Sequence, residues 1–193
     1  MKKIGLTGGI GVGKTYVSKI FKKIGIPIFN ADEQAKKCMV DDANLKAAVQ
    51  LAFGENMYLK GVLQKEELAK IVFNNSENLA KLNALVHPIV KQKFEDWCSL
   101  QSTSMVIKEA AILFESGGYK NCDAIILVIA SEESRIQRVL KRDKIKKKDI
   151  ETRIRLQWSD DKKKVLSDYL IQNEYLQTAL DQANKILNSL LNS

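Results

Sequence analysis

Two hydrophobic patterns alternate along this sequence. Short apolar runs are typical of buried strands, and they lie at residues 3–7, 26–30, 104–108, 123–129 and 168–171. Apolar residues that recur every three or four positions predict helices at 14–24, 44–51, 64–73, 78–100, 132–141, 148–158 and 175–191. Strands that alternate with helices form parallel sheets covered on both faces. We therefore predict an α/β fold, a three-layer sandwich around a central five-stranded parallel sheet.

Residues 33–100 interrupt the alternation, because they contain no convincing strand. We interpret this stretch as a helical insertion between the second and third strands. No repeat, low-complexity tract or Pro/Gly-rich linker divides the chain. A length of 193 residues therefore favours one domain with an inserted helical lobe.

Composition excludes several classes of protein. The chain is 45% hydrophobic and 28% charged, which is ordinary for a soluble globular protein. The longest apolar run, 124–130, is far shorter than the roughly 20 residues that span a bilayer. The first residues, Met-Lys-Lys, run directly into a glycine-rich turn instead of a signal-peptide core, so we expect a cytoplasmic protein without a membrane partner.

Cysteine and histidine usage argues against a zinc site and against a metal site with several histidines. Cys38, Cys98 and Cys122 are odd in number and widely spaced, which supports neither a disulfide framework nor a zinc site, and we expect them to be buried as small hydrophobic residues. His87 is the only histidine, so a site with several imidazole ligands is excluded. It precedes Pro88 near a helix, and a structural turn or capping role is favoured for it.

The positive charge is concentrated in one segment. Residues 135–164 contain thirteen Lys and Arg against five Asp and Glu, so this block accounts for the whole net charge of +8. Such a block can contact nucleic acid, close over phosphates, or simply form a solvated helix surface.

Residues 8–15, GGIGVGKT, fit the phosphate-loop pattern G-x-x-x-x-G-K-[ST] and stand between a predicted strand and a predicted helix. The glycines allow the backbone to curl so that successive N–H groups face phosphate oxygens, and the helix N-terminus adds partial positive charge. Lys14 is expected to reach the β- and γ-phosphates, and the Thr15 hydroxyl to ligate Mg²⁺. The sequence therefore predicts a site for a nucleoside triphosphate.

The remaining residues favour a small-molecule kinase. A GTPase would need N-K-x-D and D-x-x-G, and neither occurs. A kinase needs a carboxylate near the γ-phosphate and mobile arginines that neutralise charge. Asp32 follows the second strand, whose carboxyl end should lie beside the phosphate loop, although Asp32 could also be an N-cap for a helix that starts at Glu33. Arg138 and Arg142 lie four apart on a helix and lead into a basic stretch, as expected of a lid.

These motifs together resemble the dephospho-CoA kinase family almost end to end. The resemblance is carried by IGLTGGIGVGKT at 4–15, NAD at 30–32, LNALVHPIV at 82–90, AILFESG at 111–117, RVLKRD at 138–143, Gln157 and SDYLIQN at 167–173. The phosphate loop is shared with many NTPases, whereas the ordered set is much more specific.

The resemblance implies ATP-dependent phosphorylation of the ribose 3′-hydroxyl of dephospho-CoA, with ATP and Mg²⁺ bound. It implies a core of 1–32, 101–141 and 165–193, an acceptor-binding insertion of 33–100 and a lid of 142–164. Asp32, Lys14 and Arg142 would be catalytic, Thr15 would hold the metal, and His87 and Glu115 would join Asp32 in binding the acceptor. The nucleotide would contact Gly8, Gly9, Gly11, Val12, Gly13, Lys14, Thr15, Tyr16, Arg138 and Asn173.

Several positions depart from the family pattern. Asn30 stands where an aspartate is usual, Tyr16 replaces a small hydroxyl residue, Ala111 replaces a proline, and Glu174 with Tyr175 stands where a glycine commonly follows the asparagine. Glu109 and Glu115 could hold Mg²⁺ through water or orient the acceptor, and the sequence does not distinguish these roles.

Two alternatives stay open at this stage. Another small phosphate-loop kinase, acting on a nucleotide, gluconate or shikimate, would share Lys14, Thr15 and the lid but would not need so large an insertion. A nucleic-acid-binding protein with a regulatory nucleotide site would use the basic block, but aromatic residues for base stacking are not interleaved with it. We expect no nucleic-acid partner and a monomer or small homo-oligomer.

Overall fold

The computed structural model describes residues 1–73, 75–143 and 145–192. Its contacts divide the chain into two compact units. The sheet unit comprises Met1–Asn30 and Gln101–Ser193, and the helical unit comprises Ala31–Leu100. Each unit is described by itself.

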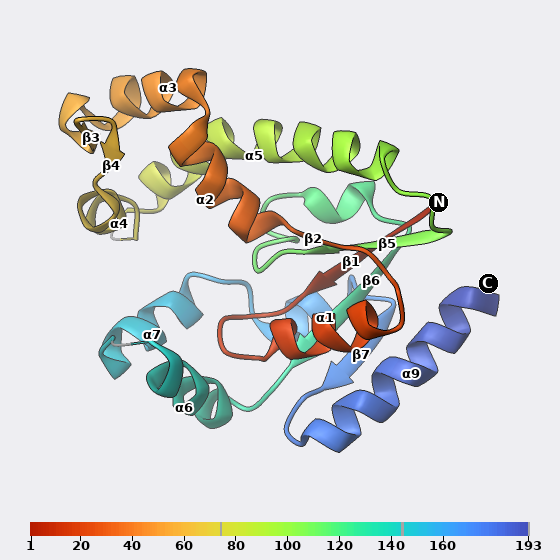
Figure 1. The fold of residues 1–193 in the computed structure, drawn as a ribbon. Helices are drawn as coiled ribbons and strands as arrows, with labels where there is room; N and C mark the ends of the chain where they lie inside the picture. The colour runs from red at the N-terminus through yellow and green to blue at the C-terminus, as the bar shows by residue number, and fades with distance from the viewer. Residues whose placement is uncertain (74, 144, 193) are drawn as a thin grey trace. The chain divides into compact units, whose positions relative to one another are not determined.

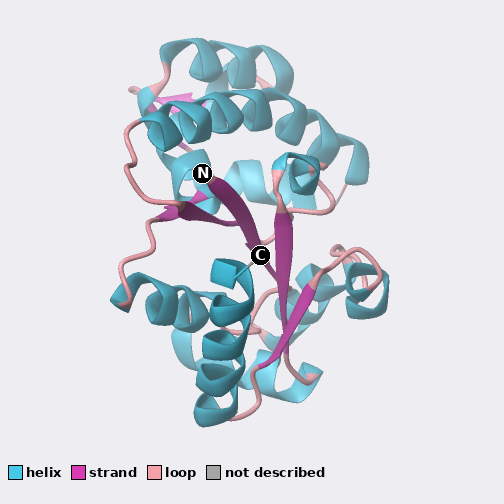
Figure 2. Cartoon of the chain, turned by 90° about the vertical axis from the view of Figure 1, so that its right-hand side faces the viewer, coloured by secondary structure: helices cyan, strands magenta, loops and turns pink. Residues whose placement is uncertain are grey.

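The sheet unit is built on five parallel strands in the order β2-β5-β1-β6-β7 (Figures 1 and 2). They are β1 (Lys2–Thr7), β2 (Ile28–Asn30), β5 (Met105–Glu109), β6 (Ala124–Ile129) and β7 (Tyr169–Gln172). All five predicted strands are therefore confirmed, to within two residues at each end.

Helices cover one face of this sheet through alternate strand residues. Side chains such as Leu6, Ile107 and Val128 belong to one buried cluster with residues of α1 (Lys14–Lys23) and α9 (Leu176–Asn192). On the opposite face, a Cβ at Gly5 would lie 2.6 Å from Leu113 and 2.7 Å from Ile125, which shows how closely the segment after β5 covers that face. The predicted three-layer α/β sandwich with a five-stranded parallel sheet is confirmed.

Three further helices of the sheet unit contain most of the basic block. α6 (Glu132–Arg142) begins at Ser131, whose hydroxyl accepts a hydrogen bond from the Ser134 amide, and α7 (Lys147–Arg155) packs on α6 around the buried residue Ile150. α7 ends three residues earlier than the sequence predicts, and the short helix α8 (Asp160–Lys164) was not predicted. A single turn is too short for a periodic hydrophobic pattern to reveal.

The helical unit contains α2 (Ala31–Asp41), α3 (Ala43–Phe53), α4 (Lys65–Phe73) and α5 (Ser76–Ser99). α5 contacts the other three helices (Figure 1), and its buried stripe is Val86, Val90, Phe94 and Cys98. Asp42 and Asn75 cap α3 and α5 by accepting backbone N–H bonds.

Four sequence-based expectations are wrong, three for this region and one, on Cys122, for the sheet unit. Residues 33–100 do contain strands, because β3 (Tyr58–Leu59) and β4 (Val62–Leu63) form a short antiparallel hairpin. Asp32 is not the N-cap of a helix at Glu33, since α2 begins at Ala31 and Asp32 lies in its first turn. His87 lies inside α5 instead of at a turn or cap, and Pro88 is accommodated within the same helix. Cys122 is only partly buried.

The other two cysteines behave as predicted. Cys38 and Cys98 are buried and free, and burial raises the pKa of the Cys38 thiol, which therefore stays protonated at neutral pH. Among the described residues, no helix has both the length and the apolar composition needed to cross a membrane.

The fold predicts a contrast between two valines of the sheet unit. Val128 in β6 is fully buried, whereas Val165 after α8 is 84% exposed. Val128→Ala should lower the free energy of unfolding by about 2 kcal/mol, because it removes two buried methyl groups and leaves a cavity. Val165→Ala should change it by less than about 0.5 kcal/mol. Urea denaturation of both variants measures the difference, and equal effects would contradict the assigned core.

Candidate active site

The glycine-rich loop connects the carboxyl end of β1 to the N-terminus of α1, as its sequence pattern predicts. β1 ends at Thr7 and α1 begins at Lys14. Gly13 is the N-cap, in the left-handed region with φ +90°, and its carbonyl accepts hydrogen bonds from the Tyr16 and Val17 amides. The first turn of α1 has no acidic residue that would offset its partial positive charge. The loop and helix therefore form an anion-binding concavity.

Two of the loop glycines are required because other chain segments approach the loop backbone. A Cβ on Gly8 would lie 2.3 Å from the Val128 carbonyl oxygen, and one on Gly13 would lie 2.2 Å from the side-chain nitrogen of Asn173. Both glycines also have positive φ, of +152° and +90°. The loop is thus packed tightly against β6 and the residue that follows β7.

Lys14 lies across the loop. Its ammonium group donates to the Gly8 carbonyl at 2.7 Å and to the Gly9 carbonyl at 3.3 Å. The positive charge is therefore held over a glycine-rich loop of the kind whose amides bind anions in other proteins. Thr15, next in the chain, is exposed in the first turn of α1. Tyr16 packs against the core, and its hydroxyl donates to the Leu176 carbonyl at 3.3 Å, so this large side chain links α1 to the start of α9.

Arg138 and Asn173 converge on one backbone group of the loop. The carbonyl of Val12 accepts from Asn173 Nδ2 at 2.8 Å and from Arg138 Nη1 at 3.3 Å. Arg138 also donates to the Asn173 carbonyl. Two predicted nucleotide-site residues, distant in sequence, therefore contact the phosphate loop, although contact with a nucleotide stays a prediction.

Glu174, one of the departures from the family pattern, joins the end of β7 to the start of α6. Its carboxylate accepts from the Ser131 amide and from the hydroxyls of Ser131 and Ser134. These bonds lower the pKa of the Glu174 carboxyl, and the bond from the Ser131 amide has the largest effect. The substitution therefore provides an anion for the N-terminus of α6.

Glu109 lies at the carboxyl end of β5, beside β1, where Leu6 is its partner in register. The carboxylate is buried and accepts from the Ser18 hydroxyl of α1 at 2.6 Å. Sequence reasoning named Glu109 without a defined role. The structure places the Glu109 carboxylate against Ser18 of α1. The hydrophobic periodicity of the sequence could not have predicted this pair.

Arg142 and Glu115 bond to other residues of the basic segment. Arg142, at the end of α6, donates to both carboxylate oxygens of Asp143 at 2.9 and 2.8 Å, and this hydrogen bond raises the pKa of the Arg142 guanidinium. Glu115 lies 3.1 Å from the fully buried ammonium of Lys163 and accepts from the Trp158 amide at 2.9 Å. The sequence does not predict that Lys163 is buried, because a lysine within a basic run normally indicates a solvated surface.

Asp32 and His87 belong to the helical unit, in α2 and α5. Their approach to the phosphate loop therefore stays a prediction. In the part of the chain that the structure describes, no group of three or more His, Cys, Asp or Glu forms a metal site.

The packing behind the loop predicts an asymmetry between two glycines with similar backbones. Gly13→Ala introduces a Cβ into the Asn173 side chain, whereas Gly25, with φ +88°, has nothing within 4 Å of the position that a Cβ would take. Gly25→Ala should cost only the strain of a left-handed alanine, about 1 kcal/mol of unfolding free energy. Gly13→Ala should cost more and should also weaken binding of a nucleoside triphosphate at least about tenfold, because the loop must shift.

Thermal unfolding and isothermal titration calorimetry with a non-hydrolysable ATP analogue measure the two effects. Normal analogue affinity in Gly13→Ala would contradict the role assigned to this turn.

Comparison with known proteins agrees with this geometry. The family model for dephospho-CoA kinase matches residues 2–178. A dephospho-CoA kinase from Chlorobium chlorochromatii is 34% identical over 95% of this chain and 91% of that protein, and one from Leptospira interrogans is 37% identical over 97% and 92%. The crystal structure of TT1252 from Thermus thermophilus matches 98% of this chain and 97% of its own with a TM-score of 0.88 and 28% identity. This chain belongs to the dephospho-CoA kinase family.

Proposed function

We propose that the chain catalyses the ATP-dependent phosphorylation of dephospho-CoA to CoA, the last step of coenzyme A biosynthesis. The observation that carries this proposal is the family match over residues 2–178. A complete phosphate loop with Lys14 held across it supports ATP as the donor. The reaction would take place in the cytoplasm, with the protein as a monomer or small homo-oligomer.

The acceptor atom would be the ribose 3′-hydroxyl. As the bond between this oxygen and the γ-phosphorus forms, the bond from phosphorus to the β,γ-bridging oxygen breaks and ADP leaves. Asp32 would accept the hydroxyl proton. Support comes from its sequence position, since Asp32 lies two residues after Asn30, where β2 ends opposite Glu109 of β5. The carboxyl ends of parallel strands form the edge at which such folds bind ligands.

Lys14 and Arg142 would stabilise the negative charge of the transferring phosphoryl group. Lys14 would exchange the loop carbonyls for phosphate oxygens. Arg142 would have to exchange Asp143 for the substrate, and its 64% exposed side chain is compatible with such a movement. The helical unit, with His87 on α5, would bind the acceptor, and Glu115 would contribute from the sheet unit.

The basic segment 142–164, of which residue 144 lies outside the described residues, would act as a lid. Its charge suits ATP and a diphosphate-bearing acceptor. Two cations of the wider basic block are committed to the interior, because Arg135 and Lys163 are buried and lie near Asp160 and Glu115. This supports a role within the enzyme more than a surface for nucleic acid.

A Mg²⁺ site fits the residues of the loop. Thr15 provides an exposed hydroxyl oxygen in the first turn of α1, and oxygen ligands of this kind suit Mg²⁺, which retains several waters. Bound there with ATP, the ion would supply neutralisation of the triphosphate's negative charge. Thr15 would hold the ion and thereby orient the triphosphate along the loop.

Substitution of the proposed base gives the first functional prediction. Asp32→Asn should lower kcat by about 10²- to 10⁴-fold, because the amide cannot accept the proton, while affinity for ATP stays within about twofold. A coupled ADP-release assay measures kcat, and calorimetry measures ATP affinity. Glu33→Gln, which removes the neighbouring exposed carboxylate of α2, is the matched control and should retain activity.

The same assay should include dephospho-CoA, adenosine, AMP, gluconate and shikimate as acceptors. Faster turnover of any acceptor other than dephospho-CoA would overturn the proposed substrate. A collapse of ATP affinity in Asp32→Asn with kcat intact would overturn the role of Asp32.

Substitution of the proposed metal ligand gives the second functional prediction. Thr15→Ala should raise the Mg²⁺ concentration required for half-maximal activity about tenfold or more, since it removes a ligand oxygen. Thr15→Ser keeps that oxygen and should restore the wild-type Mg²⁺ dependence. Titration of activity with MgCl₂ at saturating ATP measures the shift, and an unchanged curve for Thr15→Ala would remove Thr15 from the metal site.

A further inference from the structure

The peptide groups around Ile10 have little intrinsic stiffness. Ile10 stands between Gly9 and Gly11, and Gly11 has φ +79°. Glycine loses more backbone freedom on ordering than any other residue, and fixing one residue costs about 1–2 kcal/mol. A loop that binds a triphosphate tightly therefore needs these residues ordered before the ligand arrives.

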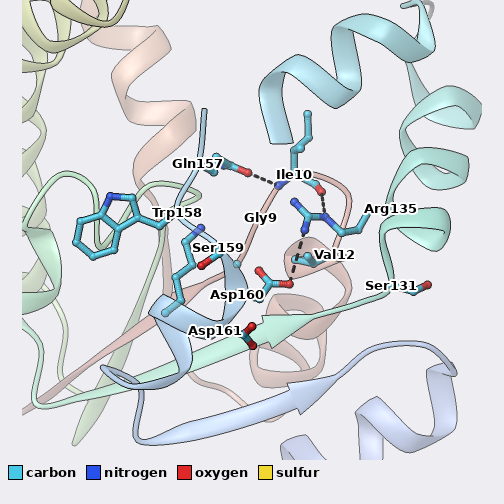
Figure 3. Close-up of polar contacts among 12 residues, drawn as sticks. Gly9, Ile10, Val12, Ser131, Arg135, Gln157, Trp158, Ser159, Asp160 and Asp161 are labelled. Atoms are coloured by element: carbon cyan, nitrogen blue, oxygen red, sulfur yellow. Dashed lines mark hydrogen bonds and ion pairs between the residues drawn. The ribbon is translucent and has the colours of Figure 1, made fainter. Parts of the chain in front are cut away.

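Both polar backbone groups of Ile10 form hydrogen bonds with side chains that lie far from it in the sequence. The Ile10 amide donates to Oε1 of Gln157 at 2.8 Å, and the Ile10 carbonyl accepts from Nε of Arg135 at 2.9 Å. Figure 3 shows Gln157 and Arg135 reaching the main chain of Ile10. The orientation of this short stretch of backbone is therefore defined by two side chains.

Arg135 is itself fixed. Its side chain is buried, and its Nη1 lies 3.6 Å from the Asp160 carboxylate of α8 (Figure 3). A Cβ on Gly9 would lie 2.2 Å from Arg135 Nη2, and one on Gly11 would lie 2.5 Å from the Arg135 carbonyl oxygen. Glycine at these two positions thus permits the close approach of α6, beyond any need of the phosphate itself.

The peptide groups before and after the Gln157 Cα are both hydrogen-bonded. Its own amide donates to the Ile154 carbonyl at the end of α7, and the next amide, of Trp158, donates to Glu115. The Trp158 ring stacks on Phe114 at 6.4 Å between centroids. The side-chain oxygen of Gln157 is therefore presented to the loop from a rigid support.

The side chain of Ile10 completes the connection. It packs with Ile154 against a buried cluster formed by Ile136 and Val139 of α6 and Ile150 of α7. Ile10 thus meets the proposed lid through its amide and its side chain. A change in the position of α7 would be transmitted to this residue of the loop.

We propose that Gln157 is a positioning residue for the donor site: it holds the Ile10 amide and orders the loop for the triphosphate before ATP binds. The proposal deepens the proposed kinase function, and rests on it for the identity of the donor. Gln157 acts through Ile10 and does not contact the transferring phosphoryl group. Its loss therefore affects ATP binding and leaves the chemical step nearly unchanged.

The test compares Gln157→Met, which keeps the length of the side chain but removes the acceptor, with Gln137→Met, the same change on the exposed face of α6. Gln157→Met should weaken binding of a non-hydrolysable ATP analogue about three- to tenfold, as expected for one lost hydrogen bond. The KM for ATP should rise by the same factor, while kcat and the KM for dephospho-CoA stay within about twofold. Gln137→Met should match the wild type in all four quantities.

Amide hydrogen exchange by NMR isolates the proposed contact. The Ile10 amide should exchange about three- to tenfold faster in Gln157→Met. It should stay protected in Gln157→Glu, which retains an acceptor oxygen at the same reach. Exposure of Ile10 in both variants would overturn the assigned acceptor.

Two other outcomes would overturn the proposal. A kcat reduced about 100-fold with normal ATP affinity would make Gln157 a catalytic residue. Tighter binding of the analogue to Gln157→Met would mean that Gln157 competes with phosphate for the Ile10 amide. Analogue binding needs no acceptor, so these results stand even if the acceptor is not dephospho-CoA. That separate failure would appear as an inactive wild type with dephospho-CoA.

Discussion

Close approach of α6 and β7 to the phosphate loop is the constraint on which the site depends. Arg135, Arg138 and Asn173 bond to backbone groups of a loop in which four of the six residues between β1 and α1 are glycine. Such contacts are possible only where Cβ atoms are absent, and at Gly9, Gly11 and Gly13 the atoms that a Cβ would strike belong to these residues. The glycine pattern therefore serves the protein's own packing as much as phosphate binding. Loop, α6 and the end of β7 form one interlocked structure.

The basic block combines two physical roles that its sequence does not separate. Arg135 and Lys163 are buried near acidic partners, where a charge is stable only if it is compensated. Arg142 and Lys147 are largely exposed and can exchange partners at little cost. The buried cations join parts of the sheet unit to one another, Arg135 of α6 to Asp160 of α8 and Lys163 of α8 to Glu115. The exposed ones are the cations that the proposed lid could bring to phosphates.

Two departures from the family pattern, Tyr16 and Glu174, make new contacts near the loop. Tyr16 bonds to the carbonyl of Leu176, and Glu174 bonds to the amide and hydroxyl groups at the start of α6. Both side chains stabilise the connection that follows β7, beside Asn173. These replacements therefore alter how the loop surroundings are held together while leaving Lys14 and Thr15 in place at the start of α1.

The sequence by itself determined the order of strands and helices in the sheet unit, the phosphate loop and the family. These features are local, because a strand is encoded in a short apolar run, and the loop in eight consecutive residues whose backbone requirements only glycine meets. Arg138 and Asn173 could also be named, through motifs at fixed spacing. The hairpin of residues 58–63 and the single-turn helix α8 could not, since neither is long enough to show a period.

Only the tertiary structure decided which side chains meet. The contacts of Gln157 with Ile10, of Arg135 with Asp160, of Ser18 with Glu109 and of Glu115 with Lys163 join residues that the fold brings together from different elements. No periodicity encodes such pairs, because hydrogen bonding and ion pairing depend on distances in space and not on spacing along the chain. The sequence could thus predict a site for a nucleoside triphosphate, but only the tertiary structure showed which side chains hold its loop.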